Sequence, residues 1–160
     1  MSVEKVISAL TPFGLSDRVM EFEVSSATVE LAAAALGTEG ARIAKSISLH
    51  GKDSGCLLIV CAGDCKIDNA KFKARFGFKP RMLSPDEALA MTGHAVGGVC
   101  PFALPENVPV YLDISLKRFD TVYPAAGSSN SAVRLSPDEL FLASGAKGWE
   151  DLCKLREPSL

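Results

Sequence analysis

Hydrophobic residues recur along the chain at two characteristic spacings, and each spacing predicts one kind of element. A helical repeat of apolar positions predicts helices over residues 3–10 and 28–36, the second ending at Gly37. Alternation of apolar and polar residues predicts a half-buried strand over residues 19–24. A third helix, with a basic face, is expected over residues 68–76. The first half of the chain therefore mixes helices with strands.

Two longer β-segments follow the second helix and predict a hairpin. Residues 43–49 and 56–61 are joined by the turn-rich segment 51–55. The run over 56–61 is apolar throughout, so we expect it to lie at the centre of a sheet. Further strands are predicted in the second half of the chain, over residues 108–114, 121–125 and 133–135.

A four-residue motif occurs twice and marks the starts of two more helices. Ser-Pro-Asp-Glu stands at residues 84–87 and again at 136–139, each time before an apolar helical run. Serine at the N-cap and glutamate three residues later form a capping box, in which each side chain accepts a hydrogen bond from the other residue's backbone N–H. The repeated carboxylates are therefore interpreted as helix caps and not as a catalytic pair.

The order of these elements predicts the fold class. Helices, strands and hairpins interleave without the strict βαβ rhythm of a doubly wound sheet. We therefore expect an α/β (α+β) fold, with a mixed, curled or barrel-like sheet of about six to seven strands packed against helices. The length of 160 residues fits a single domain spanning residues 1–160.

Composition and charge narrow the functional classes. Hydrophobic residues make up 48% of the chain and charged residues 22%, which is typical of a soluble globular protein. No apolar run reaches the roughly 18 residues of a membrane span, and Glu4 and Lys5 interrupt the N-terminal apolar positions. We therefore expect no membrane partner and a cytoplasmic location. The formal net charge of -2 excludes a generic basic coat for nucleic acid, so DNA is not an expected partner and any RNA must be bound locally.

The five cysteines favour free thiols over a metal centre. Their number is odd and their spacing lacks the paired pattern of a zinc site, which suits buried or free thiols in a reducing cytoplasm. A cluster of His50 with Cys56, Cys61 and Cys65 is the metal-binding alternative. The chain also lacks P-loop, dinucleotide-binding and HExxH motifs, so neither a metal nor a cofactor is expected.

Lys45 is the most informative single position. Within the strand predicted over 43–49, alternation places Lys45 on the same face as Ile43, Ile47 and Leu49. Burying an ammonium group in an apolar face is costly unless an anionic or polar group meets it. Lys45 is therefore either part of a ligand pocket or an inward-pointing lysine that protects an edge strand from aggregation.

The loop over residues 93–104 carries the second group of candidate residues. Gly97 and Gly98 allow backbone N–H groups to approach a ligand closely, as in a nest for a phosphate or an oxyanion. The alternative is ordinary turn chemistry before Pro101. His94, in the same loop, is either a surface histidine or a catalytic group.

Cys100 raises the alternative of a thiol nucleophile. A nucleophilic cysteine needs a base within hydrogen-bond reach. His50 and His94 are the two histidines of the chain, and nothing in the sequence places either beside Cys100. A hydrolase of a small ester or amide that uses Cys100 is therefore kept as a third hypothesis.

These motifs occur in an order that resembles the YbaK/ProX family, free-standing editing domains that hydrolyse mischarged aminoacyl-tRNA and are related to the insertion domain of bacterial prolyl-tRNA synthetase. The matching segments are residues 30–37, 43–46, 93–102, 110–119 and 126–140. The resemblance implies a trans-editing aminoacyl-tRNA deacylase for a small amino acid, with tRNA-Pro as a candidate carrier. The implied partners are the acceptor end of aminoacyl-tRNA and, as a candidate, an aminoacyl-tRNA synthetase.

The resemblance also implies roles for individual residues. Lys45 is similar to the family's lysine that holds the 3′-terminal region of the tRNA near its phosphate. Gly97 and Gly98 fall where the family keeps a glycine whose backbone N–H serves the ester carbonyl, and His94 is similar to a histidine of some members. The other residues expected to bind substrate are Ser46, Cys100, Pro101, Phe102, Gly127 and Ser128.

Such a deacylase needs no strong nucleophile, because an aminoacyl ester is already activated. The expected mechanism is oxyanion stabilisation by backbone N–H groups, with water attack assisted by the substrate's own hydroxyl or side chain. Two departures from the family pattern, Cys100 and the serine-rich segment 128–131, leave the amino acid open. A tRNA- or synthetase-binding module without catalysis is the alternative. The cations expected to grip the acceptor end are Lys45, Lys71, Lys73 and Arg75.

Overall fold

The computed structural model describes residues 2–156, which form five α-helices and nine strands. The helices are α1 (Ser2–Leu10), α2 (Val29–Leu36), α3 (Asn69–Phe76), α4 (Pro85–Thr92) and α5 (Pro137–Ser144). The strands are β1 (Val19–Glu21), β2 (Ile43–His50), β3 (Cys56–Ala62), β4 (Cys65–Ile67), β5 (Val110–Asp113), β6 (Tyr123–Pro124), β7 (Ser131–Val133), β8 (Trp149–Glu150) and β9 (Cys153–Leu155).

A mixed five-stranded sheet in the order β6-β2-β3-β5-β8 forms the centre of the molecule. The β2–β3 hairpin is antiparallel, whereas β3 pairs with β5, β5 with β8 and β2 with β6 in parallel. Every residue of β3 is buried, which confirms that the wholly apolar run predicts the central strand. The mixed pairing confirms the expected fold class, but the central sheet has five strands where about six to seven were expected.

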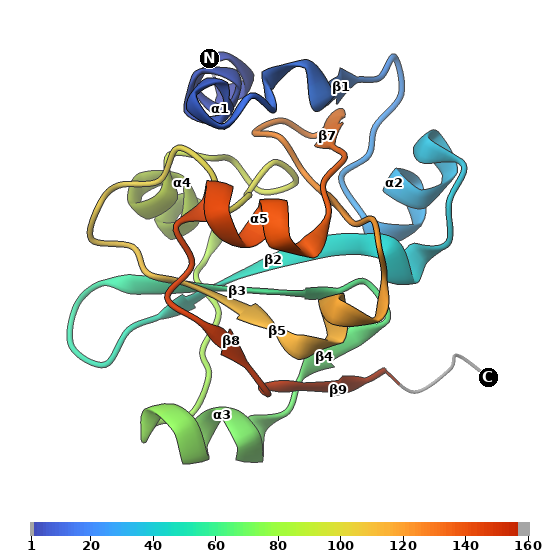
Figure 1. Cartoon of the computed structure of the whole chain (residues 1–160). Helices are drawn as coiled ribbons and strands as arrows, with labels where there is room; N and C mark the ends of the chain where they lie inside the picture. The colour runs from blue at the N-terminus through green and yellow to red at the C-terminus, as the bar shows by residue number, and fades with distance from the viewer. Residues whose placement is uncertain (1, 157–160) are drawn as a thin grey trace.

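Two short ribbons complete the fold, β1 with β7 and β4 with β9. Figure 1 shows α1, α2, α4 and α5 above the central sheet, together with β1 and β7, and α3 below it near β4 and β9. The β4–β9 ribbon joins segments that are far apart in the sequence. This arrangement brings the last described strand beside the turn that follows β3.

Local sequence signals fix the helix ends. Ser84 and Ser136 each accept a hydrogen bond from the backbone N–H of the glutamate three residues later, and both capping boxes are complete. Caps of this kind stabilise a helix by about 1 kcal/mol each. The repeated Ser-Pro-Asp-Glu motif is therefore confirmed as a pair of helix starts.

Some expected strands are shorter in the structure. The prediction of a strand over residues 19–24 is wrong beyond Glu21, because Phe22 turns away to exchange hydrogen bonds with Asn130, its N–H to the backbone oxygen and its carbonyl with the side-chain amide. The strand expected over 133–135 instead lies at Ser131–Val133. Strands β4, β8 and β9 were not predicted, since two or three residues are too few to show an alternating pattern. Among the described residues, no helix is both long and apolar enough to span a membrane.

Candidate active site

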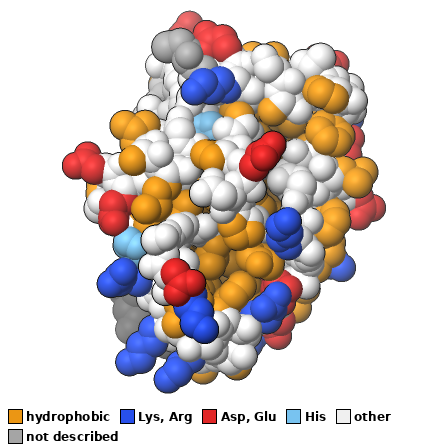
Figure 2. Space-filling view, turned by 90° about the vertical axis from the view of Figure 1, so that its left-hand side faces the viewer, with side chains coloured by type: hydrophobic (Ala, Val, Ile, Leu, Met, Phe, Trp, Pro, Cys, Tyr) orange, Lys and Arg blue, Asp and Glu red, His pale blue; other side chains and the backbone are white. Residues whose placement is uncertain are grey.

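A cavity of about 590 Å³ lies along the outer edge of β2. Its walls come from β2, the start of α2, the loop at residues 96–99, strands β6 and β7, and the segments 66–69 and 80–83. Figure 2 shows a hollow with a hydrophobic floor and with lysine and arginine side chains near its margin. The cavity therefore combines an apolar interior with a positively charged surrounding.

The incomplete pairing of β2 makes room for this cavity. Strand β6 pairs with Ile43 and Ala44, and an isolated bridge joins Leu49 to Met82. Between these points, the outer edge of β2 has no strand beside it in the described part of the chain. The stretch that carries Lys45 and Ser46 thus forms a wall of the cavity.

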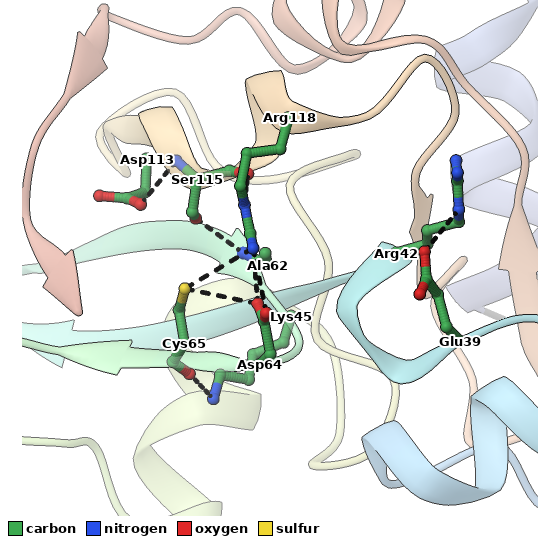
Figure 3. A network of polar contacts seen from close by, with 9 residues as sticks. All are labelled: Glu39, Arg42, Lys45, Ala62, Asp64, Cys65, Asp113, Ser115 and Arg118. Atoms are coloured by element: carbon green, nitrogen blue, oxygen red, sulfur yellow. Dashed lines mark hydrogen bonds and ion pairs between the residues drawn. The ribbon is translucent and has the colours of Figure 1, made fainter. Parts of the chain in front are cut away.

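Lys45 lines the cavity, and its ammonium group has a neutral partner. The side chain is half-buried and its Nζ donates a hydrogen bond to the backbone carbonyl of Cys65 (Figure 3). No carboxylate among residues 2–156 forms an ion pair with it. A half-buried positive charge without a counter-ion attracts an anion into its cavity.

A polar network behind β3 supports the acceptor of Lys45. Arg118, in the 3₁₀ segment Ile114–Arg118, forms two hydrogen bonds of 2.6 and 3.0 Å with Asp64, the residue before Cys65 (Figure 3). This guanidinium lowers the pKa of Asp64. The buried carboxylate of Asp113 accepts hydrogen bonds from the backbone N–H groups of Leu152 and Cys153, which fixes β9 against β4. The Cys65 carbonyl is thereby held in place.

Gly97 and Gly98 differ in position and in their hydrogen bonds. Gly97 lines the cavity with φ +96°, and its N–H has no acceptor within the described chain. The Gly98 N–H instead donates to the Ala95 carbonyl at 2.9 Å. A Cβ on Gly98 would lie 2.6 Å from the Ser128 nitrogen, so only glycine permits this contact between the two loops. Gly97 is therefore the better placed of the two to offer a backbone donor.

His94 is fully buried, contrary to the expectation of a surface loop, and it does not line the cavity. Its Nε2 donates to the Phe102 carbonyl at 2.7 Å. In the neutral ring Nδ1 is then an acceptor for the Ser2 hydroxyl at 2.8 Å, whose proton is shared with the Gly93 carbonyl at 3.1 Å. Burial lowers the pKa of His94, which favours the neutral ring that this pattern requires. His94 thus connects α1 to the loop at both ring nitrogens.

Cys100, Pro101 and Phe102 are buried and lie outside the cavity lining. The structure does place His94 near Cys100, with the Sγ 3.6 Å from Nε2. That nitrogen already carries the proton donated to Phe102, so it cannot accept one from the thiol. Burial raises the pKa of Cys100 to about 12. These observations remove the thiol-nucleophile hypothesis.

The remaining expected residues divide between the cavity and its support. Ser46 lines the cavity, and its Oγ is buried without a hydrogen-bond partner among the described residues. Gly127 has φ +96°, and a Cβ there would lie 2.8 Å from the Ser2 carbonyl oxygen. The Ser128 hydroxyl bonds to Asn130 and Ser131 at 2.8 Å. Gly127 and Ser128 therefore shape the loop behind Gly98.

The residues described by the structure contain no group of three or more histidine, cysteine or acidic side chains that could hold a metal ion. His50 instead lies 3.4 Å from Glu87. The metal-binding alternative built on His50 and three cysteines is thus wrong.

Several cavity residues were missed from the sequence. Lys66 and Asn69 lie at one end, and the exposed side chains of Met82 and Val96 lie at the mouth. Lys66 sits in a three-residue strand and Met82 in an irregular segment, so neither belongs to a pattern that marks a face. A single sequence carries no signal that would have assigned them to the cavity.

Comparison with known proteins identifies the family. The family model described as "Aminoacyl-tRNA editing domain" matches residues 23–142. The chain belongs to the aminoacyl-tRNA editing domain family. This editing domain is 54% identical to YwhH of Bacillus subtilis (strain 168), over 96% of this chain and 98% of that protein.

Two further relatives connect the editing domain to named activities. It is 28% identical to an Enterococcus faecalis (strain ATCC 700802 / V583) protein named "Putative Cys-tRNA(Pro)/Cys-tRNA(Cys) deacylase EbsC", over 71% of this chain and 70% of that protein. A crystal structure described as "a putative trans-editing enzyme for prolyl tRNA synthetase" superimposes with a TM-score of 0.86 at 32% identity, covering 96% of this chain and 97% of the other. The editing domain thus shares its fold with a protein described as acting in trans.

Proposed function

We propose that this protein is a trans-editing deacylase that hydrolyses the ester of a mischarged tRNA carrying a small amino acid. The observation that carries the proposal is the half-buried Lys45, which faces the cavity without a counter-ion and shares that cavity with the free N–H of Gly97. An anion site beside an unused backbone donor suits a phosphate-linked ester. The family and the names of the relatives favour the same reaction.

The proposed nucleophile is a water molecule and not a residue of the cavity wall. Water attacks the carbonyl carbon, the bond from that carbon to the ribose oxygen breaks, and the ribose oxygen takes up the proton that water gives up. Gly97 N–H stabilises the oxyanion, while Lys45 holds the phosphate that positions the ester. A hydroxyl or amino group of the substrate itself assists the water. The proposal therefore needs no cofactor and no thiol.

The size of the cavity bears on what is bound. A volume of about 590 Å³ falls within the range of pockets that hold complete small ligands, so it has room for the terminal nucleoside together with its amino acid. Cysteine and tRNA-Pro, which appear in the names of the relatives, are the first candidates to test. We place the activity in the cytoplasm, where aminoacyl-tRNA is used, with a synthetase as a second candidate partner.

The decisive measurement is amino acid release from a panel of tRNAs charged with alanine, cysteine, serine, threonine and proline. At least one mischarged tRNA should be deacylated well above the uncatalysed rate. The result that refutes the proposal is a panel in which every ester decays at the blank rate. Correctly charged tRNA should be spared, because a second sieve excludes the cognate amino acid.

A binding module without catalysis is the alternative function. It is favoured by the cavity walls, whose lining among the described residues contains no histidine, cysteine or carboxylate and offers only lysine, amide, hydroxyl and backbone groups. This alternative predicts binding of an acceptor-stem RNA with no turnover of any panel member. Binding and deacylation measured on the same preparation separate the two functions.

A further inference from the structure

The β4–β9 ribbon carries two lysines in direct opposition. Lys66 on β4 pairs with Lys154 on β9, and both side chains are exposed. Residues directly opposite in an antiparallel pair point to the same face of the ribbon, about 5 Å apart at Cβ. Like charges at such a pair destabilise a ribbon. The opposed lysines therefore lower the stability of the ribbon. Because both side chains are exposed, packing does not account for their presence.

The neighbouring acidic groups do not neutralise this pair. Neither lysine forms an ion pair among the described residues. Asp68 caps α3 by accepting a hydrogen bond of 3.0 Å from the backbone N–H of Lys71, and this bond together with the Lys154 charge lowers the pKa of Asp68. This single carboxylate therefore offsets only part of the charge of the two lysines. Positive charge thus remains on the ribbon of a protein whose net charge is -2.

Two of the cations that the sequence suggested for RNA binding, Lys71 and Arg75, form ion pairs within the protein. Lys71 forms an ion pair of 2.8 Å with Asp151, and Arg75 one of 3.0 Å with Glu150. Both therefore hold α3 against the segment that precedes β9. Lys73 forms no ion pair among the described residues, but it lies on α3 outside the cavity lining, whereas Lys66 on the ribbon lines the cavity.

The ribbon is continuous with the cavity. Lys66 lines the cavity and follows Cys65, whose carbonyl accepts from Lys45. Strand β4 thus connects the three lysines: it contacts Lys45 of β2 through the Cys65 carbonyl, it carries Lys66, and it pairs with β9, which carries Lys154. Figure 2 shows lysine and arginine side chains on both sides of the hollow, with some acidic side chains among them. A polyanion that enters the cavity meets positive charge along this direction.

We propose that Lys66 and Lys154 bind the phosphodiesters just upstream of the aminoacylated nucleotide, so that the single-stranded end of the tRNA leaves the cavity across the β4–β9 ribbon. This inference rests on the proposed function and adds a path for the RNA. The occupant is a nucleic acid because the ribbon offers charge without a shaped pocket, which suits a flexible phosphate backbone.

The test compares Lys66→Ala, Lys154→Ala and the double variant with Lys147→Ala. Lys147 is an exposed lysine that lines a different hollow, so it is a matched control for the loss of one charge. For deacylation of charged tRNA, each ribbon variant should raise KM about 3- to 10-fold with little change in kcat. The slope of log kcat/KM against log salt should fall by about 0.7 per lysine removed.

A second substrate separates phosphate binding from chemistry. A 2′(3′)-O-aminoacyl-adenosine has the ester but no phosphodiester, so Lys154→Ala, whose lysine does not line the cavity, should hydrolyse it as the wild type does. None of the variants should have a lower Tm, because each relieves a repulsion. Equal KM values for Lys66→Ala, Lys154→Ala and Lys147→Ala on tRNA would overturn the inference and leave the proposed function intact.

Binding provides a readout that does not depend on turnover. Fluorescence anisotropy with a labelled acceptor-stem hairpin should show weaker binding by both ribbon variants than by Lys147→Ala. If the wild type hydrolyses nothing yet shows this pattern, the proposed function fails and the RNA path stands. If all variants bind the hairpin equally, the path is wrong whatever the enzyme activity.

Discussion

Lys45 places a positive charge in an apolar wall, and this position separates the needs of function from those of stability. Its partner in the protein is a neutral carbonyl, so the charge is hydrogen-bonded without being neutralised. Desolvation of an ammonium group costs free energy that one neutral hydrogen bond only partly offsets. If Lys45 served packing alone, an apolar side chain would stabilise this wall at least as well. The charge is therefore better explained by function than by stability.

The expected consequence is that Lys45→Met loses activity without losing stability. Loss of a charge-assisted contact to phosphate should lower kcat/KM about 10- to 100-fold, while Tm stays within about 3 °C of the wild type. Deacylation kinetics and thermal unfolding of the same samples test this. Lys45→Arg keeps the charge, so its kcat/KM is expected to lie between those of the wild type and Lys45→Met. Full activity of Lys45→Met would disprove the role assigned to this lysine.

At the scale of elements, the cavity depends on two loops that pack without side chains between them. Gly98 meets the backbone of Gly127 and Ser128, and Gly127 in turn meets the Ser2 carbonyl at the start of α1. Helix α1 therefore supports the loop at residues 127–128, which supports the loop that holds Gly97. These contacts leave no room for a Cβ at the two glycines.

Gly98→Ala should consequently destabilise the protein. The added Cβ would lie 2.6 Å from one backbone atom and 2.7 Å from another, which forces the two loops apart. Overpacking of this kind costs about 1–3 kcal/mol and should lower Tm by roughly 2–4 °C per kcal/mol. Activity should fall with it, because Gly97 moves with the loop. Since this change disturbs the structure, it does not distinguish an enzyme from a binding module.

Gly55→Ala is the matched control for that experiment. Gly55 lies in the hairpin turn, and a Cβ there meets nothing within 4 Å. Its unfolding temperature and deacylation rate should equal those of the wild type. A Gly98→Ala protein as stable as Gly55→Ala would show that the loops separate without cost.

At the scale of the whole molecule, the sequence predicts the elements that have a long hydrophobic repeat or a clear capping signal at their ends. The five helices, the central hairpin and both capping boxes follow from periodicity and caps. The β4–β9 ribbon cannot be predicted in this way, because each of its strands has only three residues. Its two strands are also far apart in the sequence, as the pairing of Lys66 with Lys154 shows. Alternation singles out Lys45, but the structure places all of residues 43–49 in the cavity lining, so the cavity does not distinguish the two faces of β2. The burial of His94 depends on α1 folding back over its loop, a contact between residues 92 apart. Local patterns carry no information about such contacts.

The buried His94 makes the stability of the whole protein depend on pH. Burial lowers the pKa of His94 below its ordinary value of 6.5, and the groups around it are the Phe102 carbonyl, the Ser2 hydroxyl, the Cys100 thiol and, at longer range, the Lys5 ammonium group. Below pH 6.5 the unfolded chain binds a proton that the folded protein does not, so the free energy of unfolding falls as pH decreases.

One such histidine contributes a slope of up to about 1.4 kcal/mol per pH unit between its unfolded and folded pKa values. Denaturant unfolding between pH 7 and 5 should show this slope in the wild type and in His50→Gln, whose histidine is partly exposed beside Glu87. It should be absent in His94→Gln, which is less stable at pH 7 but less sensitive to acid. Carboxylates with lowered pKa values, such as Glu139, act at lower pH, because an unfolded glutamate titrates near 4.5. An unchanged slope in His94→Gln would mean that His94 has the same pKa in the folded and unfolded protein, so that its burial does not cause the acid sensitivity.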